Sequence, residues 1–332
     1  MDTPPIIEAG ELRELSRRPP SPAFSPLSGR TSVIVKVRRG ALGKDKAAVR
    51  DWLRAVPCPV IGIGGKASDP ALNDACDVVA EHAEEATRLA QSAARHPLAA
   101  AVLVQLLRVT ENLPIDDAIT AESLAYATLQ AGAEHKRWLA THRPPRAETD
   151  VGPAVVMTRK GKQLDLELNR PSNRNAMSVE MRDALNEAFE LVVSDASIKS
   201  VKLSGRGDCF STGGDLAEFG TVPDPVIGHA VRSIALPARL LARCAKRVEV
   251  RVHSACIGSG IELPAFAARV VAAKKSFFQL PELAMGLIPG AGGTVSIPRR
   301  IGRQRTAWLV LSGEIIDSKA AKAWGLIDAI KG

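Results

Sequence analysis

The spacing of apolar residues changes near residue 152 and divides the chain into two parts. Across residues 74–141, Ala and Leu recur at steps of three and four, which is the spacing of amphipathic helices. The pattern is interrupted at Pro97, around Pro114 and at Gly132. We therefore predict several helices that pack on one another, with one packed face formed by Ala121, Leu124, Ala125, Thr128 and Leu129.

From residue 152 onward, strands and helices are predicted to alternate. Leucines at 164, 166 and 168 alternate with acidic residues, as in a half-buried strand, and Lys160-Gly161 joins this strand to another at 155–158 as a hairpin. Further strands are predicted at 200–203 and 248–252, and helices at 178–193, with Ser178 as its N-cap, and at 226–245. Such repeated units predict a layered α/β fold that binds ligands at its strand-to-helix loops.

The first 77 residues have a different character. Residues 1–28 hold six prolines and no sustained period, which predicts a flexible Pro-rich arm. Residues 29–77 predict a small α/β element with strands at 31–37 and 59–63 and a helix at 44–56. Its segment 61–66 lacks the spacing of a phosphate-binding loop, so we interpret it as a turn. The remaining predicted units are a helical domain at 78–143, a linker at 144–151 and the α/β core at 152–332.

Composition narrows the classes of function. Hydrophobic residues make up 45% and charged residues 24%, as in ordinary globular proteins. Lys and Arg exceed Asp and Glu by 44 − 36 = 8, which favours an anionic ligand, but one Tyr and 4% aromatic residues leave little to stack on bases, so we expect no nucleic acid partner. Five cysteines without a CxxC pair indicate neither a disulfide framework nor a zinc site. Without a signal peptide or a run of about 18 apolar residues, we expect a cytoplasmic protein and no membrane partner.

Two glycine-rich turns have the features of a site that stabilises negative charge. In Cys209–Leu216 the pair Gly213-Gly214 lets the backbone approach a ligand closely. In Gly258–Pro264 the glycines precede a helix, where unpaired N–H groups lie beside the positive end of the helix dipole. The two turns together predict an oxyanion hole.

Two glutamates accompany these turns. Glu262 follows the second turn, and Glu282 opens the glycine-rich segment 280–294. Two carboxyl groups that face one cavity can divide acid and base roles when their environments separate their pKa values. The alternative is structural, with Glu282 paired to a cation and Glu262 placed only to favour a helix N-terminus. His253 ends a strand, and we interpret it as a hydrogen-bonded structural residue.

These segments resemble the enoyl-CoA hydratase/isomerase, or crotonase, family over residues 152–331, because both oxyanion-hole loops and a PEhhhGhhPGxGGT-like stretch recur in order. The resemblance implies the α/β ClpP/crotonase fold, a layered β-β-α superhelix core, here with an additional helical domain. It implies backbone N–H donors at Gly214 and Ser259 and acid–base roles for Glu262 and Glu282. It also implies coenzyme A contacts at Asn169, Arg170, Pro171, Asn175, Ala176, Ser211, Gly213, Asp215 and Leu216.

The same resemblance implies that coenzyme A enters only as part of the substrate, with no metal and no permanently bound cofactor. It implies a homo-oligomer, a trimer or a hexamer. The chain departs from the family at Ser259, where glycine is usual, and at His253-Ser254, which stand for Asn-Gly.

Family members usually continue past the segment matching 320–330 into a helical tail, whereas this sequence stops at Gly332. Residues 78–143 resemble that tail, so we predict that it is relocated to the N-terminal half, as in a circular permutation. An unrelated helical domain is the alternative. Residues 29–77 are then interpreted as a possible degenerate crotonase unit.

The predicted function is hydration of a 2-enoyl-CoA thioester to a 3-hydroxyacyl-CoA. Other reactions of the same fold, by an enoyl-CoA isomerase or an acyl-CoA hydrolase, remain alternatives. So does a non-catalytic acyl-CoA-binding subunit, which the residues at 253, 254 and 259 would suit.

Overall fold

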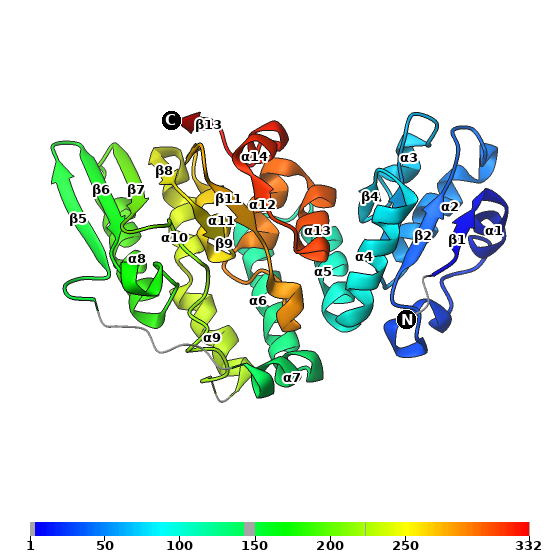
Figure 1. The fold of residues 1–332 in the computed structure, drawn as a ribbon, viewed down its shortest axis with the longest axis horizontal. Helices are drawn as coiled ribbons and strands as arrows, with labels where there is room; N and C mark the ends of the chain where they lie inside the picture. Colours follow the sequence, from blue (N-terminus) through cyan, green and yellow to red (C-terminus); the bar gives the residue numbers. More distant parts are fainter. Residues whose placement is uncertain (1–3, 143–149, 223, 332) are drawn as a thin grey trace.

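Two larger sheets lie at opposite ends of the molecule, with helices between them (Figure 1). A computed structural model describes residues 4–142, 150–222 and 224–331. Most of the predicted linker, residues 144–149, lies outside these described residues. Both larger sheets are mainly parallel and carry helices, so the α/β prediction is confirmed.

The N-terminal sheet is fully parallel and follows the order of the sequence, β1-β2-β3-β4. The strands predicted at 31–37 and 59–63 and the helix predicted at 44–56 are all present. Of the segment 61–66, interpreted as a turn, residues 61–63 belong to strand β3, and the turn comes only after them. The elements are β1 (Ile6–Glu8), α1 (Ala9–Leu15), β2 (Val33–Lys36), α2 (Lys46–Ala55), β3 (Val60–Ile63), α3 (Pro70–Asn73) and β4 (Val78–Ala80).

The prediction of a flexible arm at 1–28 is wrong for its described part. Strand β1 pairs with β2, and Ile7 and Leu12 are buried in the core of this unit. Phe24 packs edge-on against Trp52, with ring centroids 4.9 Å apart. The prolines at 22 and 26 begin short 3₁₀ helices, where the missing N–H costs nothing. A three-residue strand is too short to show a period, which is why the pattern missed it.

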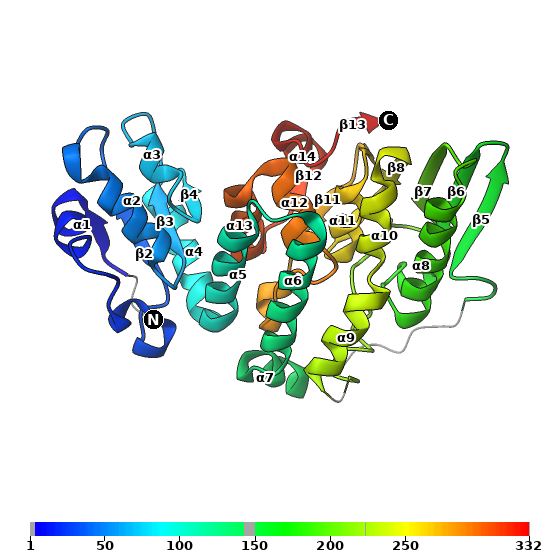
Figure 2. The same ribbon diagram turned by 180° about the vertical axis from the view of Figure 1, so that it is seen from behind.

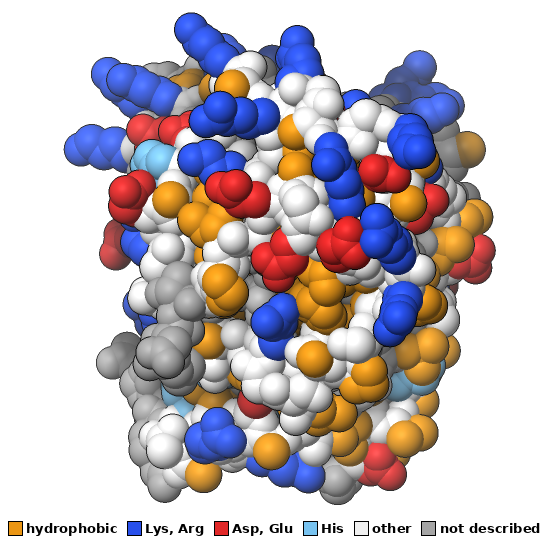
Figure 3. Space-filling model, turned by 90° about the vertical axis from the view of Figure 1, so that its right-hand side faces the viewer, with side chains coloured by type: hydrophobic (Ala, Val, Ile, Leu, Met, Phe, Trp, Pro, Cys, Tyr) orange, Lys and Arg blue, Asp and Glu red, His pale blue; other side chains and the backbone are white. Residues whose placement is uncertain are grey.

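Exposed basic residues follow the carboxyl ends of two N-terminal strands. Arg38 and Arg39 follow β2, with Lys44 further along, and Lys66 follows β3. Figure 3 shows Lys and Arg side chains gathered towards one edge of this end of the molecule. Part of the net charge of +8 is therefore concentrated on the N-terminal unit.

Four helices connect this unit to the rest, and their limits match the predicted breaks. Helix α5 begins at Pro97, α6 follows Pro114, and α7 follows Gly132. Figure 2 shows α5 and α6 beside α12 and α13, against which they pack. No helix within the described ranges combines the length and the apolar character needed to cross a membrane. The bounds are α4 (Ala83–Arg95), α5 (Pro97–Thr110), α6 (Ile115–Gln130) and α7 (Ala133–Thr141).

The larger sheet has the order β13-β10-β8-β7-β6-β5, with the predicted antiparallel hairpin at β5-β6 and parallel pairing elsewhere. Ser178 caps α8, since its Oγ accepts a hydrogen bond from Met181 N at 3.2 Å. The elements are β5 (Val155–Lys160), β6 (Gln163–Leu168), α8 (Val179–Ser194), β7 (Ser200–Gly205), α9 (Pro225–Ala235), α10 (Pro237–Cys244), β8 (Val248–Val252), β10 (Arg269–Ala273) and β13 (Ala329–Lys331).

The single helix predicted at 226–245 is wrong, because the structure has two helices, α9 and α10. Leu236 between them is extended, and Pro237 begins α10. Proline inside a helix removes a hydrogen bond and clashes with the preceding turn, so it is accommodated here as a first residue. The break lets α9 turn onto α6 while α10 stays on α8.

A small third sheet, with the order β12-β11-β9, positions the candidate site. Strands β9 and β11 are parallel, so the segments after Ile257 and Gln279 leave the sheet at the same edge. Those segments hold Glu262 and Glu282. The bounds are β9 (Ala255–Ile257), α11 (Ser259–Glu262), β11 (Phe277–Gln279), α12 (Gly293–Ile301), α13 (Arg303–Ser312), β12 (Ile316–Asp317) and α14 (Ser318–Trp324).

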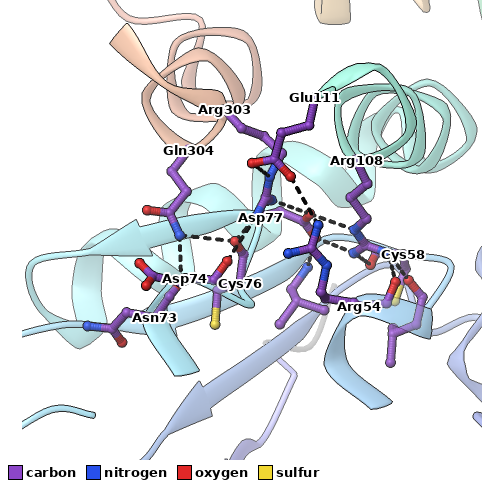
Figure 4. Close-up of polar contacts among 12 residues, drawn as sticks. Arg54, Cys58, Asn73, Asp74, Cys76, Asp77, Arg108, Glu111, Arg303 and Gln304 are labelled. Atoms are coloured by element: carbon purple, nitrogen blue, oxygen red, sulfur yellow. Dashed lines mark hydrogen bonds and ion pairs between the residues drawn. The ribbon is translucent and has the colours of Figure 1, made fainter. Parts of the chain in front are cut away.

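A buried ion-pair network joins the N-terminal unit to helices α5 and α13 (Figure 4). Asp77, just before β4, accepts hydrogen bonds from Arg108 Nε on α5 at 2.8 Å and from Arg303 Nη1 on α13 at 3.2 Å. Its other oxygen accepts from Val60 N at 2.9 Å. Glu111 links Arg303 to a further arginine of the N-terminal unit. Because the carboxylate is 1% exposed and has partners on three elements, it fixes the N-terminal sheet to the core.

Candidate active site

The first glycine-rich turn, Cys209–Leu216, runs against the strand-like backbone of Met177. Met177 N donates to Gly213 O at 2.7 Å, and Asp215 N donates to Met177 O at 3.2 Å. These bonds leave the N–H of Gly214 pointing away, and no acceptor for it lies within the described residues. Gly213 has a φ of 93°, and a Cβ there would lie 3.0 Å from Ile257 O, so glycine is required.

The second turn meets the first. A Cβ built on Gly258 would lie 3.6 Å from Gly213 Cα, and one on Gly260 would lie 2.6 Å from Ser211 O. Ser259 begins α11, so its N–H has no partner inside the helix, and the described chain offers it none elsewhere. The structure therefore brings together the two loops that were predicted to carry the oxyanion-hole amides.

Glu262 lies at the end of α11 and is 2% exposed. Its Oε2 accepts hydrogen bonds from Ala291 N at 2.7 Å and Gly293 N at 2.9 Å. Burial raises the pKa of Glu262 well above its usual range, and the charges of Glu282 and Glu122 raise it further. The two amide bonds oppose this shift because they favour the ionised form.

Glu282 is the first residue of a 3₁₀ helix (Glu282–Met285). A Cβ on Gly258 would lie 2.7 Å from Glu282 Oε1 and 3.8 Å from Glu262 Oε1, so both carboxyl groups face the same glycine. Glu282 Oε2 is enclosed and has no hydrogen-bond partner among the described residues. Burial raises the pKa of Glu282 to about 8, with a smaller contribution from the charge of Glu122. Among the described residues, neither glutamate forms the ion pair that the structural alternative required of Glu282.

A third glutamate, Glu122 on α6, was missed by the sequence analysis. It is 1% exposed and accepts hydrogen bonds from Gly292 N at 2.7 Å, Thr294 N at 2.8 Å and Thr294 Oγ1 at 2.6 Å. Burial raises the pKa of Glu122 to about 7. An isolated acidic residue three positions after Ile119, on an otherwise apolar stripe, was the signal that could have revealed it.

The predicted packed face of α6 is confirmed at Ala121, Ala125 and Leu129, which pack on the core, and is wrong at Leu124 and Thr128. Leu124 is 52% exposed and Thr128 is exposed, whereas the buried residues are Ala118, Ile119, Glu122, Ser123, Ala127 and Leu129. The polar residues Glu122 and Ser123 are buried on this helix because each has hydrogen-bond partners. Ser123 Oγ, for example, accepts from Arg232 Nε at 3.0 Å and lies 2.9 Å from His229 Nδ1.

Tyr126 on α6 and Arg232 on α9 lie near the glutamates of the site. The Tyr126 ring lies against Gly290, where a Cβ would have no room. The Arg232 guanidinium carbon lies 4.7 Å from the centroid of that ring, a cation–π geometry. Burial raises the pKa of Tyr126 and lowers the pKa of Arg232. The three glutamates therefore have the cation of Arg232 and the neutral phenol of Tyr126 close to them.

The side chains predicted to contact coenzyme A are used mainly inside the protein. Asn175 Oδ1 accepts from Arg170 N at 2.9 Å, and Asn175 Nδ2 donates to Arg206 O at 2.8 Å. Arg170 Nε donates to Glu180 Oε2 at 2.9 Å, and this bond raises the pKa of Arg170. Asn169, Ser211 and Asp215 likewise bond to neighbouring groups. These residues shape the loops, so contacts with a ligand there would come mostly from the backbone.

The ring of His253 bonds to a backbone carbonyl group and not to either glutamate. Its Nε2 is 2.9 Å from Gly207 O, in agreement with the structural interpretation. Ser254 beside it has a φ of 51°, a conformation that favours glycine.

The second half of the chain is similar to proteins of known function. The family model described as enoyl-CoA hydratase/isomerase matches residues 160–331. The 2,3-dehydroadipyl-CoA hydratase of Escherichia coli is 33% identical over 176 residues, which cover 53% of this chain and 68% of the relative. The 1,2-epoxyphenylacetyl-CoA isomerase of the same organism is 34% identical over 168 residues, 49% of this chain and 64% of the relative.

Solved structures give the same result. An enoyl-CoA hydratase from Thermoplasma volcanium aligns with a TM-score of 0.50 and 27% identity, covering 54% of this chain and 72% of that chain. One from Mycobacterium smegmatis has a TM-score of 0.50 and 28% identity, covering 54% and 70%. The matched half of this chain contains the glycine-rich turns, Glu262 and Glu282, while α4–α7 precede the matched residues of the family model.

Proposed function

This chain belongs to the enoyl-CoA hydratase/isomerase family and has the crotonase fold, and from that membership we propose that it hydrates a 2-enoyl-CoA thioester to a 3-hydroxyacyl-CoA. The observation that carries the proposal is the pair Glu262 and Glu282, whose carboxyl groups both face Gly258, where the second glycine-rich loop meets the first. The similarity to a 2,3-dehydroadipyl-CoA hydratase supports it.

The proposed role of the two loops is to bind developing negative charge. When water attacks the β-carbon, the electrons of the double bond move to the thioester oxygen and form an enolate. The unpaired amides of Gly214 and Ser259 would hold that oxygen. Fixed donors bind the enolate more tightly than the neutral thioester, and each contributes about 10²–10³ in rate.

The proposed role of the glutamates is to move two protons. Glu262, ionised, takes a proton from water as the oxygen bonds to the β-carbon. Glu282, protonated, gives its proton to the α-carbon as the enolate collapses, and the product then holds one added water. Burial raises the pKa of both carboxyl groups, and the pKa of about 8 keeps Glu282 protonated at neutral pH. Only Glu262 Oε2 has amide donors, which favour its ionised form, and protonation of Glu282 removes one of the charges that raise the pKa of Glu262.

We further propose that α5–α7 do the work of the helical tail that covers the active site in this family. Three contacts support this role. Glu122 bonds to the loop at Gly292, α6 packs on α9 and α12, and His135 Nδ1 on α7 lies 2.9 Å from Met285 O. Strands β2 and β3, which lie within 29–77, are adjacent and parallel like the successive strands of the core, and this supports a degenerate crotonase unit there.

A double-bond isomerase is the second candidate. Moving a double bond requires only proton transfers at two carbons next to an enolate, which the same glutamate pair can perform. The similarity to a 1,2-epoxyphenylacetyl-CoA isomerase makes this candidate specific.

The test is turnover of crotonyl-CoA and longer 2-enoyl-CoAs. Hydration removes the absorbance of the conjugated thioester and adds one water to the product mass, an isomer keeps the substrate mass, and hydrolysis releases free coenzyme A. In Glu282→Gln we expect thioester binding to persist while kcat falls about 10²–10⁴-fold. Binding by the wild-type protein without turnover at any chain length would instead indicate an acyl-CoA-binding subunit.

A further inference from the structure

Four consecutive amides alternate between two glutamates, and they belong to the segment 290–294, a loop that runs into the first turn of α12. The amides of 291 and 293 donate to Glu262 Oε2, and those of 292 and 294 donate to the two carboxylate oxygens of Glu122. Glu262 belongs to the core, whereas Glu122 lies on α6, before the residues that the family model matches. The loop is therefore held between carboxylates from two halves of the chain.

We propose that Glu122 is a positioning residue, which fixes the loop 290–294 and through it the carboxylate of Glu262. The proposal rests on the function proposed above. Glu122 itself touches the loop and not the reacting atoms, since all three of its hydrogen bonds are to Gly292 and Thr294.

The chemistry of the contact favours this role over simple packing. An apolar side chain could cover α12 without the cost of burying a carboxyl group. Hydrogen bonds to an ionised acceptor are short and directional, so they fix the direction of the loop amides. A displacement of about 1 Å at a catalytic group can cost about 10² in rate, which makes such fixing valuable.

Glu122 also acts through its charge. The groups that face it are Glu262 and Glu282 of the core, Arg232 on α9, Tyr126 on its own helix and the Thr294 hydroxyl. Its negative charge raises the pKa of both catalytic glutamates. Arg232 lowers the pKa of Glu122 and so favours its ionised form.

The primary test is Glu122→Gln in the full chain. With crotonyl-CoA we expect kcat to fall about 10²-fold while KM stays near the wild-type value. Both limbs of the pH profile of kcat should move to lower pH, because a negative charge near both glutamates is removed. Amide hydrogen exchange of the peptide containing 290–294 should become faster.

Glu134→Gln is the matched control. Glu134 on α7 is also buried and also accepts two backbone amides, from Leu98 N at 2.9 Å and Ala99 N at 3.1 Å, but these belong to the start of α5. We expect this variant to lose stability and to speed exchange at 97–100, with kcat and its pH profile unchanged.

Glu122→Asp separates position from charge and serves if Glu122→Gln does not fold. Asp keeps the charge but is one methylene too short to reach both amides, so kcat should fall without a shift in the pH profile. Wild-type kcat in Glu122→Asp or Glu122→Gln, or equal losses in Glu122→Gln and Glu134→Gln with no pH shift, would overturn the proposal. If the wild-type protein itself shows no turnover, the proposed function fails, and unchanged exchange at 290–294 in Glu122→Gln would then count separately against the positioning role.

Discussion

Gly258 and Glu282 approach each other so closely that no other side chain fits at position 258. A Cβ there would lie 2.7 Å from Glu282 Oε1, and the φ of 51° already disfavours any residue with a side chain. The loop that carries the amide of Ser259 and the carboxyl group of Glu282 therefore form one continuous wall. A side chain at position 258 must therefore displace Glu282 or the loop.

Gly258→Ala should consequently abolish most of the activity. The methyl group displaces Glu282 or the loop, and we expect kcat to fall by at least about 10²-fold. Gly161→Ala is the control, because Gly161 has a similar φ of 61° but open space around its Cβ position in the β5-β6 hairpin. Gly161→Ala should lose about 1–2 kcal/mol of stability from backbone strain, and Gly258→Ala should lose at least as much. Equal activities for the two variants would argue against the shared wall.

The rate should depend on the ionisation of Glu282. Because burial raises its pKa to about 8, it is protonated at neutral pH and can act as the acid. We expect kcat to decline as the pH rises through about 8. The measurement is kcat for crotonyl-CoA between about pH 6 and 10, and a profile that stays level to pH 10 would contradict the assigned role.

The free energy of unfolding should also depend on the ionisation of Glu282. The pKa of Glu282 is about 8 in the folded protein against 4.5 ordinarily, so the folded state binds the proton more tightly than the unfolded state. This contribution is fully present below pH 4.5 and is lost as the pH rises through 8. Glu122, whose pKa in the folded protein is about 7, contributes to stability in the same way, and its contribution is lost as the pH rises through 7. We expect the free energy of unfolding to fall less steeply with pH in Glu282→Gln than in the wild type, and identical slopes would refute the linkage.

The network around Asp77 gives a prediction about stability alone. Asp77→Asn leaves Arg108 and Arg303, which are 10% and 6% exposed, without their buried carboxylate. Removing one partner of a buried ion pair costs about 3–5 kcal/mol, which urea unfolding can measure. Asp51→Asn is the control, since Asp51 pairs with Arg50 at the exposed surface and should matter by at most about 1 kcal/mol. A similar small loss in both variants would mean that the network does not hold the N-terminal unit in place.

Whether helices α5–α7 are needed to cover the active site can be tested by expressing the chain in two pieces. Residues 150–332 expressed alone would expose the apolar surfaces on which α5 and α6 pack, including that of α12. We expect this fragment to be insoluble or inactive, and co-expression with residues 1–142 to restore soluble, active protein. A soluble and fully active fragment 150–332 would show that α5–α7 are not needed to complete the site.

The sequence predicted those features that local patterns determine. The β5-β6 hairpin, the cap at Ser178 and the breaks at Pro97 and Gly132 each follow from a few neighbouring residues. Gly213 and Gly258 were found for the same reason, because close backbone approach leaves only glycine at such positions.

Features that depend on distant partners were not predictable in this way. The buried face of α6 contains Glu122 and Ser123, and their burial is explained only by the loop at 290–294 and by Arg232 on α9. Strand β1 is ordered by pairing with β2 rather than by its own sequence. A hydrophobic pattern records burial of apolar groups and says nothing about polar groups that find partners in the tertiary structure.

The most direct test of the account is a crystal structure with a bound acyl-CoA thioester analogue such as acetoacetyl-CoA. The account predicts that the thioester oxygen lies within hydrogen-bonding distance, about 2.7–3.1 Å, of the amides of both Gly214 and Ser259, with Glu262 beside the β-carbon and Glu282 beside the α-carbon. A thioester bound elsewhere, or one that contacts neither amide, would contradict it.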